Sequence, residues 1–172
     1  MKENNHRVHP SFFRLHPLQV RLRLIWTGKT RDAHLRALIE GYLERLSHFV
    51  RCEVSEFRES PGTEKKAGID KDSRRISNGL REGAVNVLLD PEGAEWSSEQ
   101  LAKEIQQWQD GGTKELTFIV GGPNGVSTEL SARASKRWSL SRLTLTHEIA
   151  RLVLVEQLYR AYTIIHGLPY QK

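Results

Sequence analysis

The sequence predicts an α/β domain, a mainly parallel sheet with helices on both faces. Short apolar or alternating runs recur along the chain, and most are followed by a segment with helical periodicity. Two of these runs, 85–89 and 116–120, are almost continuously apolar. Such runs are typical of central strands that are covered on both faces, and strands that alternate with helices favour parallel pairing.

The first part of the domain is expected to form a strand, a helix and a second strand. Residues 20–26 alternate apolar and basic side chains, as a strand with one buried face does. Asp32 is placed to cap a helix that reaches about residue 49. The second strand covers 52–57. The helix carries one apolar stripe, made of Leu35, Leu38, Ile39, Tyr42, Leu43 and Leu46.

The middle of the chain is more polar. Residues 58–68 contain Gly and Pro among charged side chains and predict a loop. A polar helix is expected over 70–81, followed by the buried strand 85–89. The sequence Asp-Pro-Glu-Gly at 90–93 predicts a sharp turn that ends this strand.

The next helix has a clear start signal. Ser97 and Gln100 are spaced as a capping box, in which each side chain bonds the backbone of the other residue. The strand 116–120 follows, and directly after it comes the sequence Gly-Gly-Pro-Asn-Gly at 121–125.

The last part of the chain is expected to form a helix, a strand and a long helix. Ser127 or Thr128 begins the first helix, which reaches about residue 136. Residues 138–145 alternate and are interpreted as a strand with a polar interruption. Thr146 is placed to cap the last helix, which covers 147–166.

Length and composition fit a cytoplasmic protein of one domain. The chain has 172 residues, 38% of them hydrophobic, which is enough for a real core. The single cysteine, Cys52, excludes an internal disulfide and a zinc site of clustered cysteines, and we expect no metal. No apolar run is long enough for a membrane span. We interpret residues 1–19 as a poorly ordered extension and 20–172 as the domain.

The positive charge is concentrated at the end of the chain. Residues 133–172 carry seven Lys and Arg against two Glu, whereas the whole chain has a net charge of +5. A localised basic surface is expected for a phosphate-rich partner such as nucleic acid. Solubility is the plainer explanation, and the charge alone leaves both open.

Three loops are expected at the carboxyl ends of the strands, where α/β sheets bind ligands. Two of them follow Leu89 and Val120, and the third lies around 139–146. The glycines at 121–125 let backbone N–H groups approach a ligand. The stretch matches neither a P-loop nor a dinucleotide fingerprint, so a nucleotide site and a plain turn both remain open. In the third loop, leucines alternate with hydroxyls, which suits a strand and also suits an adenine ring between leucines.

The last helix is unusual because apolar residues cover most of its circumference. One of its sides is therefore expected to face a second subunit. His147 and Arg151 are four residues apart at the helix start, a place that suits an anionic group. Gly167 ends the helix, and Tyr170 near the chain end can stack on an unpaired base.

Several of these segments together resemble a known family. In order they are a buried strand ending in Leu-Asp at 89–90, then IVGGPNG, WSLSxLTLxH and RLVLVEQLYRAYTIIxGxPYxK. The chain from 20 to 172 is similar to the small stand-alone SPOUT methyltransferases that methylate N3 of a pseudouridine in large-subunit (23S) ribosomal RNA.

The resemblance implies a fold, a cofactor and partners. The C-terminal segment would thread a loop to form a trefoil knot, which general rules of chain topology would exclude. The cofactor would be S-adenosylmethionine. The protein would act as a homodimer on assembled ribosomes. The matching cofactor positions are Leu89, Gly121, Leu140, Ser141, Arg142, Leu143, Thr144 and Leu145.

The candidate catalytic residues are His147, Arg151 and Tyr170. His147 is a candidate base for the imide proton, and Arg151 a candidate electrostatic stabiliser of the deprotonated ring. Two positions depart from the family pattern: Thr146 replaces a common Pro, and Gln171 a common His in the terminal motif. The rival hypotheses are a flavodoxin-like binder of nucleotide or phosphate through the Gly-rich loop, and a ribosome-associated RNA-binding protein without catalysis.

Overall fold

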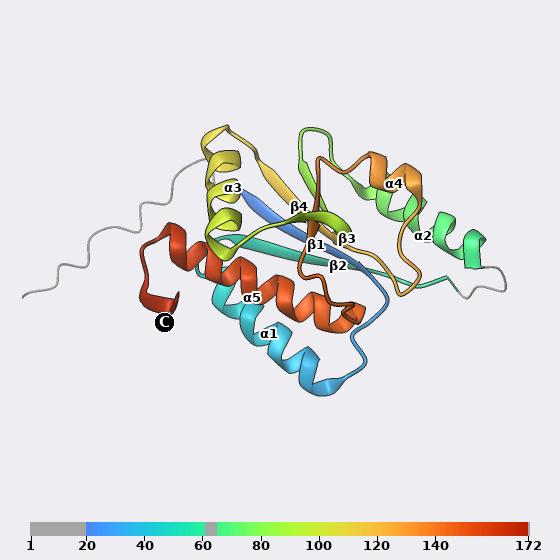
Figure 1. The fold of residues 1–172 in the computed structure, drawn as a ribbon, viewed down its shortest axis with the longest axis horizontal. Helices are drawn as coiled ribbons and strands as arrows, with labels where there is room; N and C mark the ends of the chain where they lie inside the picture. Colours follow the sequence, from blue (N-terminus) through green and yellow to red (C-terminus); the bar gives the residue numbers. More distant parts are fainter. Residues whose placement is uncertain (1–19, 61–64, 172) are drawn as a thin grey trace, which may run out of the picture.

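Five strands form one sheet (Figure 1), and all neighbouring strands pair in parallel, as the sequence predicts; their order, which the sequence pattern does not predict, is β2-β1-β4-β3-β5. The computed structural model describes residues 20–60 and 65–171. The predicted extension 1–19 therefore lies outside the described residues. The strands are β1 (Arg21–Thr27), β2 (Arg51–Phe57), β3 (Val85–Glu95), β4 (Glu115–Val120) and β5 (Lys136–Ser139).

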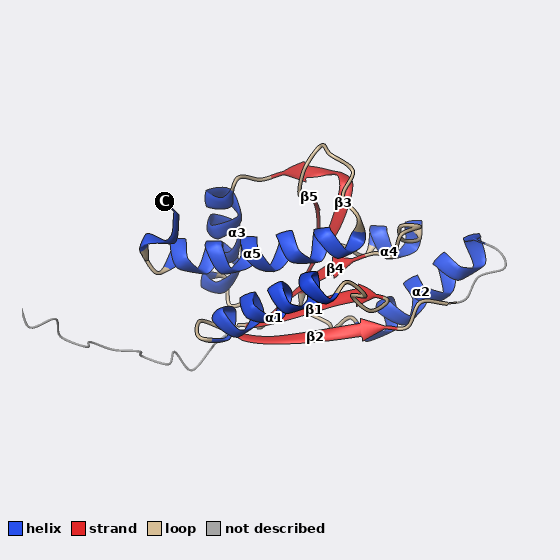
Figure 2. Ribbon diagram, turned by 90° about the horizontal axis from the view of Figure 1, so that it is seen from below, coloured by secondary structure: helices blue, strands red, loops and turns tan. Residues whose placement is uncertain are grey.

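Helices cover both faces of this sheet. The longer ones are α1 (Ala33–Ser47), α2 (Lys65–Gly79), α3 (Ser98–Asp110) and α5 (His147–Ile165), and α4 (Thr128–Ala132) is a short helix. A 3-10 helix, η1 (Pro169–Gln171), follows α5. Helices α1 and α3 pack on either side of α5, whereas α2 and α4 contact each other away from them (Figure 2).

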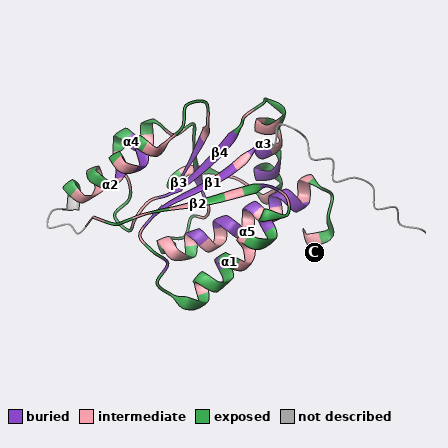
Figure 3. Cartoon of the chain, turned by 180° about the vertical axis from the view of Figure 1, so that it is seen from behind, coloured by how far each residue is buried: buried purple, intermediate pink, exposed green. Residues whose placement is uncertain are grey.

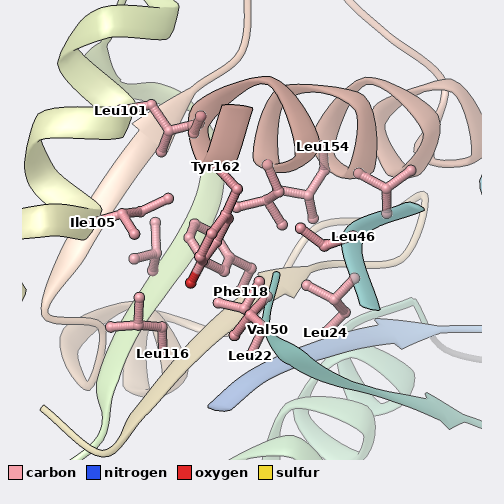
Figure 4. Close-up of a cluster of buried hydrophobic side chains, with 14 of the residues drawn as sticks. Leu22, Leu24, Leu46, Val50, Leu101, Ile105, Leu116, Phe118, Leu154 and Tyr162 are labelled. Carbon is pink, nitrogen blue, oxygen red and sulfur yellow. The ribbon is translucent and has the colours of Figure 1, made fainter. Parts of the chain in front are cut away.

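The main core lies between the sheet and the α1, α3 and α5 layer. Alternate residues of each central strand face it, as the period of two requires. Leu22 and Leu24 of β1 and Phe118 of β4 are fully buried there against Leu154 of α5 (Figure 4). A smaller cluster covers the opposite face, and its members are Ile25, Ile76, Leu88, Ile119 and Leu130. Both faces of the central strands are therefore buried, which explains their continuous apolar runs.

Three helix starts form as predicted. Asp32 accepts hydrogen bonds from the backbone N–H groups of His34 and Leu35. Ser97 and Gln100 form a complete capping box. Thr146 accepts from the N–H of the third helical residue and begins α5.

Two predictions in the middle of the chain are wrong in detail. Helix α2 begins at Lys65 rather than at 70, because Ile69, Ser73 and Ile76 already share one inward face. The Asp-Pro-Glu-Gly segment does not end β3. It forms a bulge, in which Leu89 and Ala94 both pair with Trp138 and the residues between them are left out of the ladder.

The boundaries after β4 also differ from the prediction. Helix α4 ends at Ala132 and β5 begins at Lys136, where a longer helix was expected. Strand β5 then ends at Ser139, so residues 140–146 form a loop. The hydroxyls of this segment bond its own backbone: Ser139 Oγ donates to the Ser141 carbonyl oxygen at 3.0 Å, and Ser141 Oγ accepts from Leu143 N at 3.0 Å. Local bonds of this kind compete with a strand ladder.

The predicted apolar stripe of α1 is wrong at one position. Leu38 is 52% exposed, although its neighbour Ile39 is buried. The trefoil knot stays a prediction from the family resemblance. No helix in the described part of the chain is long and apolar enough to cross a membrane.

Candidate functional site

The bulge at 90–93 in β3 and the loops after β4 and β5 meet and enclose a cleft of about 490 Å³, called here the loop cleft. The predicted loop after Leu89 is this bulge, because β3 continues to Glu95. Its lining is mostly apolar, with a small number of hydroxyls and backbone groups. Both the size and this composition are typical of sites for cofactors and other small molecules.

The Gly-rich loop forms one wall of the loop cleft. Gly125 has a φ of 82°, and its N–H donates to the Gly122 carbonyl oxygen at 2.9 Å, which closes a tight turn. A Cβ atom on Gly121 would lie 2.9 Å from Val126 Cγ1, so the loop depends on the missing side chain. Ser127 then caps α4, and its own N–H donates to Ser73 Oγ of α2 at 2.8 Å.

Seven of the eight predicted cofactor positions line the loop cleft: Leu89, Gly121, Leu140, Ser141, Leu143, Thr144 and Leu145. The eighth, Arg142, belongs to the same loop, but its side chain is 89% exposed and pairs with Glu95. Arg142 can therefore contact a molecule in the loop cleft only through its backbone.

One buried polar atom in the lining lacks a protein partner. Trp138 is 2% exposed, and its Nε1 forms no hydrogen bond within the described residues. Its ring stacks on Trp96 at 5.4 Å and lines the loop cleft. Buried donors are nearly always paired, so an unpaired N–H beside a cleft is unusual. Within the described residues, no cluster of side chains fits a metal ion.

His147 stands at the boundary of the loop cleft. It is the first residue of α5 and is half-buried. Burial lowers the pKa of His147, and the positive charge of Arg151 lowers it further. The imidazole is therefore held in its neutral form, which can accept a proton.

Arg151 is fully buried and lines neither the loop cleft nor any other cleft described below. Its Nη2 donates to the Thr27 carbonyl oxygen at 2.6 Å, and its Nη1 donates to Thr30 Oγ1 at 3.0 Å. The guanidinium also lies 5.4 Å from the centre of the Trp26 ring. These contacts occupy both Nη atoms of Arg151, and its role beside the reacting atoms stays a prediction. The contacts join α5 to the turn after β1.

Tyr170 is also away from the loop cleft of its own chain. Its hydroxyl lies 3.3 Å from Glu156 Oε1 and 3.3 Å from the Tyr42 hydroxyl, and its ring packs on Tyr159. Glu156 is nine residues beyond His147, which is about 13 Å along a helix axis. The 3-10 helix η1 is therefore docked on α5 and α1 through Tyr170.

A second and larger cleft, of about 1300 Å³, adjoins the first and is called here the side cleft. It lies at the carboxyl ends of β1 and β2, between the turn 27–31, residues 56–60, one face of α2, the Gly-rich loop and the start of α5. Sequence reasoning missed it. The rule that ligands bind beyond the carboxyl ends of parallel strands would have found it, had it been applied to the first two strands as well.

A parallel α/β sheet with a ligand-sized cleft at the ends of its strands defines a class, the α/β proteins that bind small molecules at this edge of the sheet. Comparison with known proteins narrows this class. The chain belongs to the SPOUT methyltransferase family, because the family model described as "Predicted SPOUT methyltransferase" matches residues 20–171. It is therefore a methyltransferase.

Curated relatives match almost from end to end. The chain is 40% identical over 151 residues to the ribosomal RNA large subunit methyltransferase H of Geotalea daltonii, which covers 88% of this chain and 99% of that protein. A protein of the same name from an Anaeromyxobacter species is 39% identical over 156 residues, covering 89% and 100%.

Solved structures share the fold at low sequence identity. A probable methyltransferase from Bordetella pertussis superimposes with a TM-score of 0.55 at 12% identity, over 83% of this chain and 95% of that one. A putative methylase family protein from Neisseria gonorrhoeae gives 0.51 at 13% identity, over 88% and 86%. At such identities the likeness concerns the fold alone.

Proposed function

We propose that this protein is an S-adenosylmethionine-dependent methyltransferase that modifies N3 of a pseudouridine in large-subunit (23S) ribosomal RNA of the assembled ribosome. The similarity to relatives named large-subunit rRNA methyltransferase H carries this proposal, because it extends over nearly their whole length. The two rival hypotheses are less well supported. Membership of a methyltransferase family favours neither a flavodoxin-like binder nor an RNA-binding protein without catalysis.

We propose that the loop cleft holds S-adenosylmethionine. The apolar side chains of its lining suit the faces of an adenine ring, and the free backbone groups suit the ring edge. The unpaired Trp138 Nε1 gives the ligand one further donor. When bound, this cofactor supplies an electrophilic methyl group. The residues in contact with it would be the seven lining positions together with the backbone of Arg142.

The chain must also remove a proton, because N3 of the target ring carries one before methylation. His147 is the proposed acceptor, since it borders the loop cleft and its pKa is lowered. Arg151 acts through position rather than contact, by holding the turn after β1 and by placing a buried positive charge beside His147.

A homodimer is proposed for two reasons. Leu38 of α1 and Ile149 of α5 are 52% and 40% exposed. Their helices pack side by side (Figure 3), and a second copy would cover these apolar side chains. Tyr170 cannot reach the loop cleft of its own chain while it is docked near Glu156. In a dimer, Tyr170 of one protomer could approach the cleft of the other. Since burial raises the pKa of its hydroxyl, Tyr170 would donate a hydrogen bond rather than accept a proton.

The proposal is tested by mass spectrometry of ribosomal RNA. Cells that lack the gene should carry an unmethylated pseudouridine where normal cells carry the methylated one, and purified protein with S-adenosylmethionine should restore the methyl group on their ribosomes. An enzyme that modifies assembled ribosomes would work in the cytoplasm. Calorimetry with S-adenosylmethionine, flavin and nucleoside triphosphate separates the rival binders. Ribosomal RNA that is unchanged by loss of the gene would overturn the proposal.

A further inference from the structure

The side cleft is not needed to hold the cofactor, yet it is the larger of the two clefts. Its volume of about 1300 Å³ exceeds the range of about 300–1,000 Å³ usual for small-molecule sites. A ligand that fills it would be longer than a single cofactor, such as a nucleotide with its neighbouring phosphates.

The two clefts share one wall. Five residues line both of them, and they are Gly122, Pro123, Gly125, Val126 and His147. A methyl donor in the loop cleft and an acceptor in the side cleft would therefore be separated only by the Gly-rich loop and one imidazole. Transfer between two bound molecules requires such a junction, because the reacting atoms must come within about 3–3.5 Å.

Three cations at the side cleft are placed to contact an anion. Lys29, Arg31 and Arg58 line the cleft and are exposed, and none of their side chains forms an ion pair within residues 20–60 and 65–171. Unpaired cations spaced around a cleft are the usual contacts of a phosphate backbone.

The side cleft also contains four carboxylates, and three of them already have donors. Glu148 accepts from the backbone N–H groups of Arg31 and Asp32 at 3.0 and 3.2 Å. Asp72 accepts from Ser60 N and Oγ, and Glu56 accepts from Trp26 Nε1. Glu59 is the fourth. Three of the four carboxylates are thus held in place by bonds that build the walls, although they keep their negative charge, whereas the three exposed cations are available to a ligand.

The interior of the side cleft offers what an unstacked base requires. Phe57, Ile69, Ile76 and Val126 provide apolar surface, and Asn124 in the Gly-rich loop provides an amide with both a donor and an acceptor. Single-stranded bases are recognised by stacking on apolar surface and by hydrogen bonds to their edges.

We propose that the side cleft is the acceptor subsite: it binds the target nucleotide of an RNA, with Lys29, Arg31 and Arg58 on the flanking phosphates and the base directed toward the shared wall at His147. This proposal rests on the proposed function, because it needs a methyl donor in the loop cleft. It assigns RNA binding to the turn after β1 and the end of β2, and not only to the basic C-terminal quarter.

The test uses the full-length protein with Lys29→Glu and Arg58→Glu, alone and combined. Lys103→Glu is the matched control, since Lys103 is an exposed lysine of α3 that lines neither cleft. The probes are S-adenosylmethionine by calorimetry and ribosomes purified from cells lacking the gene. We expect KM for ribosomes to rise by about tenfold for each cleft variant, with unchanged affinity for S-adenosylmethionine. The salt dependence of ribosome binding should fall by about one unit of slope for each removed phosphate contact.

Four outcomes would overturn the proposal. Cleft variants that methylate like the control would show that the RNA does not enter the side cleft. Weaker S-adenosylmethionine binding by the cleft variants would assign the side cleft to the cofactor. A rise of KM in Lys103→Glu equal to that in the cleft variants would indicate unspecific electrostatic attraction. Capture of a ribosomal protein by wild-type protein, with no protection of RNA, would replace RNA with a protein partner. If wild-type protein methylates no ribosomal RNA at all, the proposed function fails first, and the two failures are thereby distinguished.

Discussion

Arg151 Nη2 donates a hydrogen bond of 2.6 Å to the carbonyl oxygen of Thr27, and this bond joins the last helix to the end of the first strand. Thr27 and Arg151 are both buried, so water cannot replace the bond. The guanidinium therefore fixes the turn that separates the side cleft from the core. Gly28 in this turn leaves the guanidinium close to the cleft, because a Cβ there would lie 4.0 Å from Arg151 Nη2.

Arg151→Ala is expected to lower the free energy of unfolding by about 2 kcal/mol, since hydrogen bonds to charged groups contribute about 1.5–3 kcal/mol. Denaturant titration measures this change. Arg142→Ala is the control, because its side chain is 89% exposed and its ion pair should contribute at most about 1 kcal/mol. Arg151→Lys should recover part of the stability that Arg151→Ala loses. Its KM for ribosomes should lie between those of the wild-type protein and Arg151→Ala. Equal stability of the two alanine variants would contradict the positioning role.

The second prediction concerns proton transfer. The pKa of His147 lies below its ordinary value of 6.5, first because of burial and then because of the charge on Arg151. The neutral form thus persists as the pH falls through 6.5, and the acid limb of the kcat profile should lie below that pH. Below 6.5 the unfolded chain binds this proton more readily than the folded one, so the His147 contribution lowers stability as the pH falls.

An NMR titration of the His147 ring, assigned with His147→Ala, measures this pKa directly. Arg151→Met removes the positive charge and should move the pKa of His147 upward, whereas Arg151→Lys keeps the charge and should leave it low. A titration midpoint at or above 6.5 in the wild-type protein would exclude the proposed electrostatic effect.

A third prediction tests the placement of the cofactor. In Gly121→Val the new Cβ would collide with Val126 at 2.9 Å and approach the Gly125 backbone at 3.4 Å. The Gly-rich loop must then shift, and S-adenosylmethionine binding should be lost while the protein stays folded. Gly41→Ala on α1 has no atom within 4 Å of the new Cβ and serves as the control. Calorimetry that shows unchanged affinity in Gly121→Val would place the cofactor elsewhere.

The sequence predicts much of this molecule because local signals and burial agree in it. The strand 116–120 is apolar since both its faces are covered, and Asp32, Ser97 and Thr146 cap the helices that they were expected to cap. The bulge at 90–93 could not be predicted. It depends on the pairing of Leu89 and Ala94 with the same residue of β5, which lies far along the chain.

The candidate site could also be predicted only in part. Loops at strand ends are predictable from a general rule, and seven cofactor positions do line one cleft. The burial of Arg151 could not be predicted, because a helical wheel shows the side of the helix on which a residue lies but not how deeply its side chain is buried. The same holds for Tyr170, whose partners Tyr42 and Glu156 come from two different helices.

The last prediction addresses Tyr170 and the dimer together. A protomer with Gly121→Val has a defective cofactor cleft and an intact C-terminal end, and a protomer with Tyr170→Ala has the reverse. If Tyr170 serves the cleft of the other protomer, a mixed dimer contains one complete site and should recover up to about half of the wild-type rate. Each variant alone should be inactive on ribosomes. Purified mixed dimers carrying two different affinity tags, assayed by methyl transfer to ribosomes, measure this recovery.

Tyr42→Phe is the control for this experiment, because it removes one hydrogen-bond partner of Tyr170 and leaves the Tyr170 side chain in place. It should retain most of the activity. An inactive mixed dimer would mean that Tyr170 acts within its own chain, and η1 would then have to leave α5 during the reaction. A monomer by light scattering at micromolar concentration would refute the shared site altogether, and His147 would remain as the only one of the three predicted catalytic residues that lines the loop cleft.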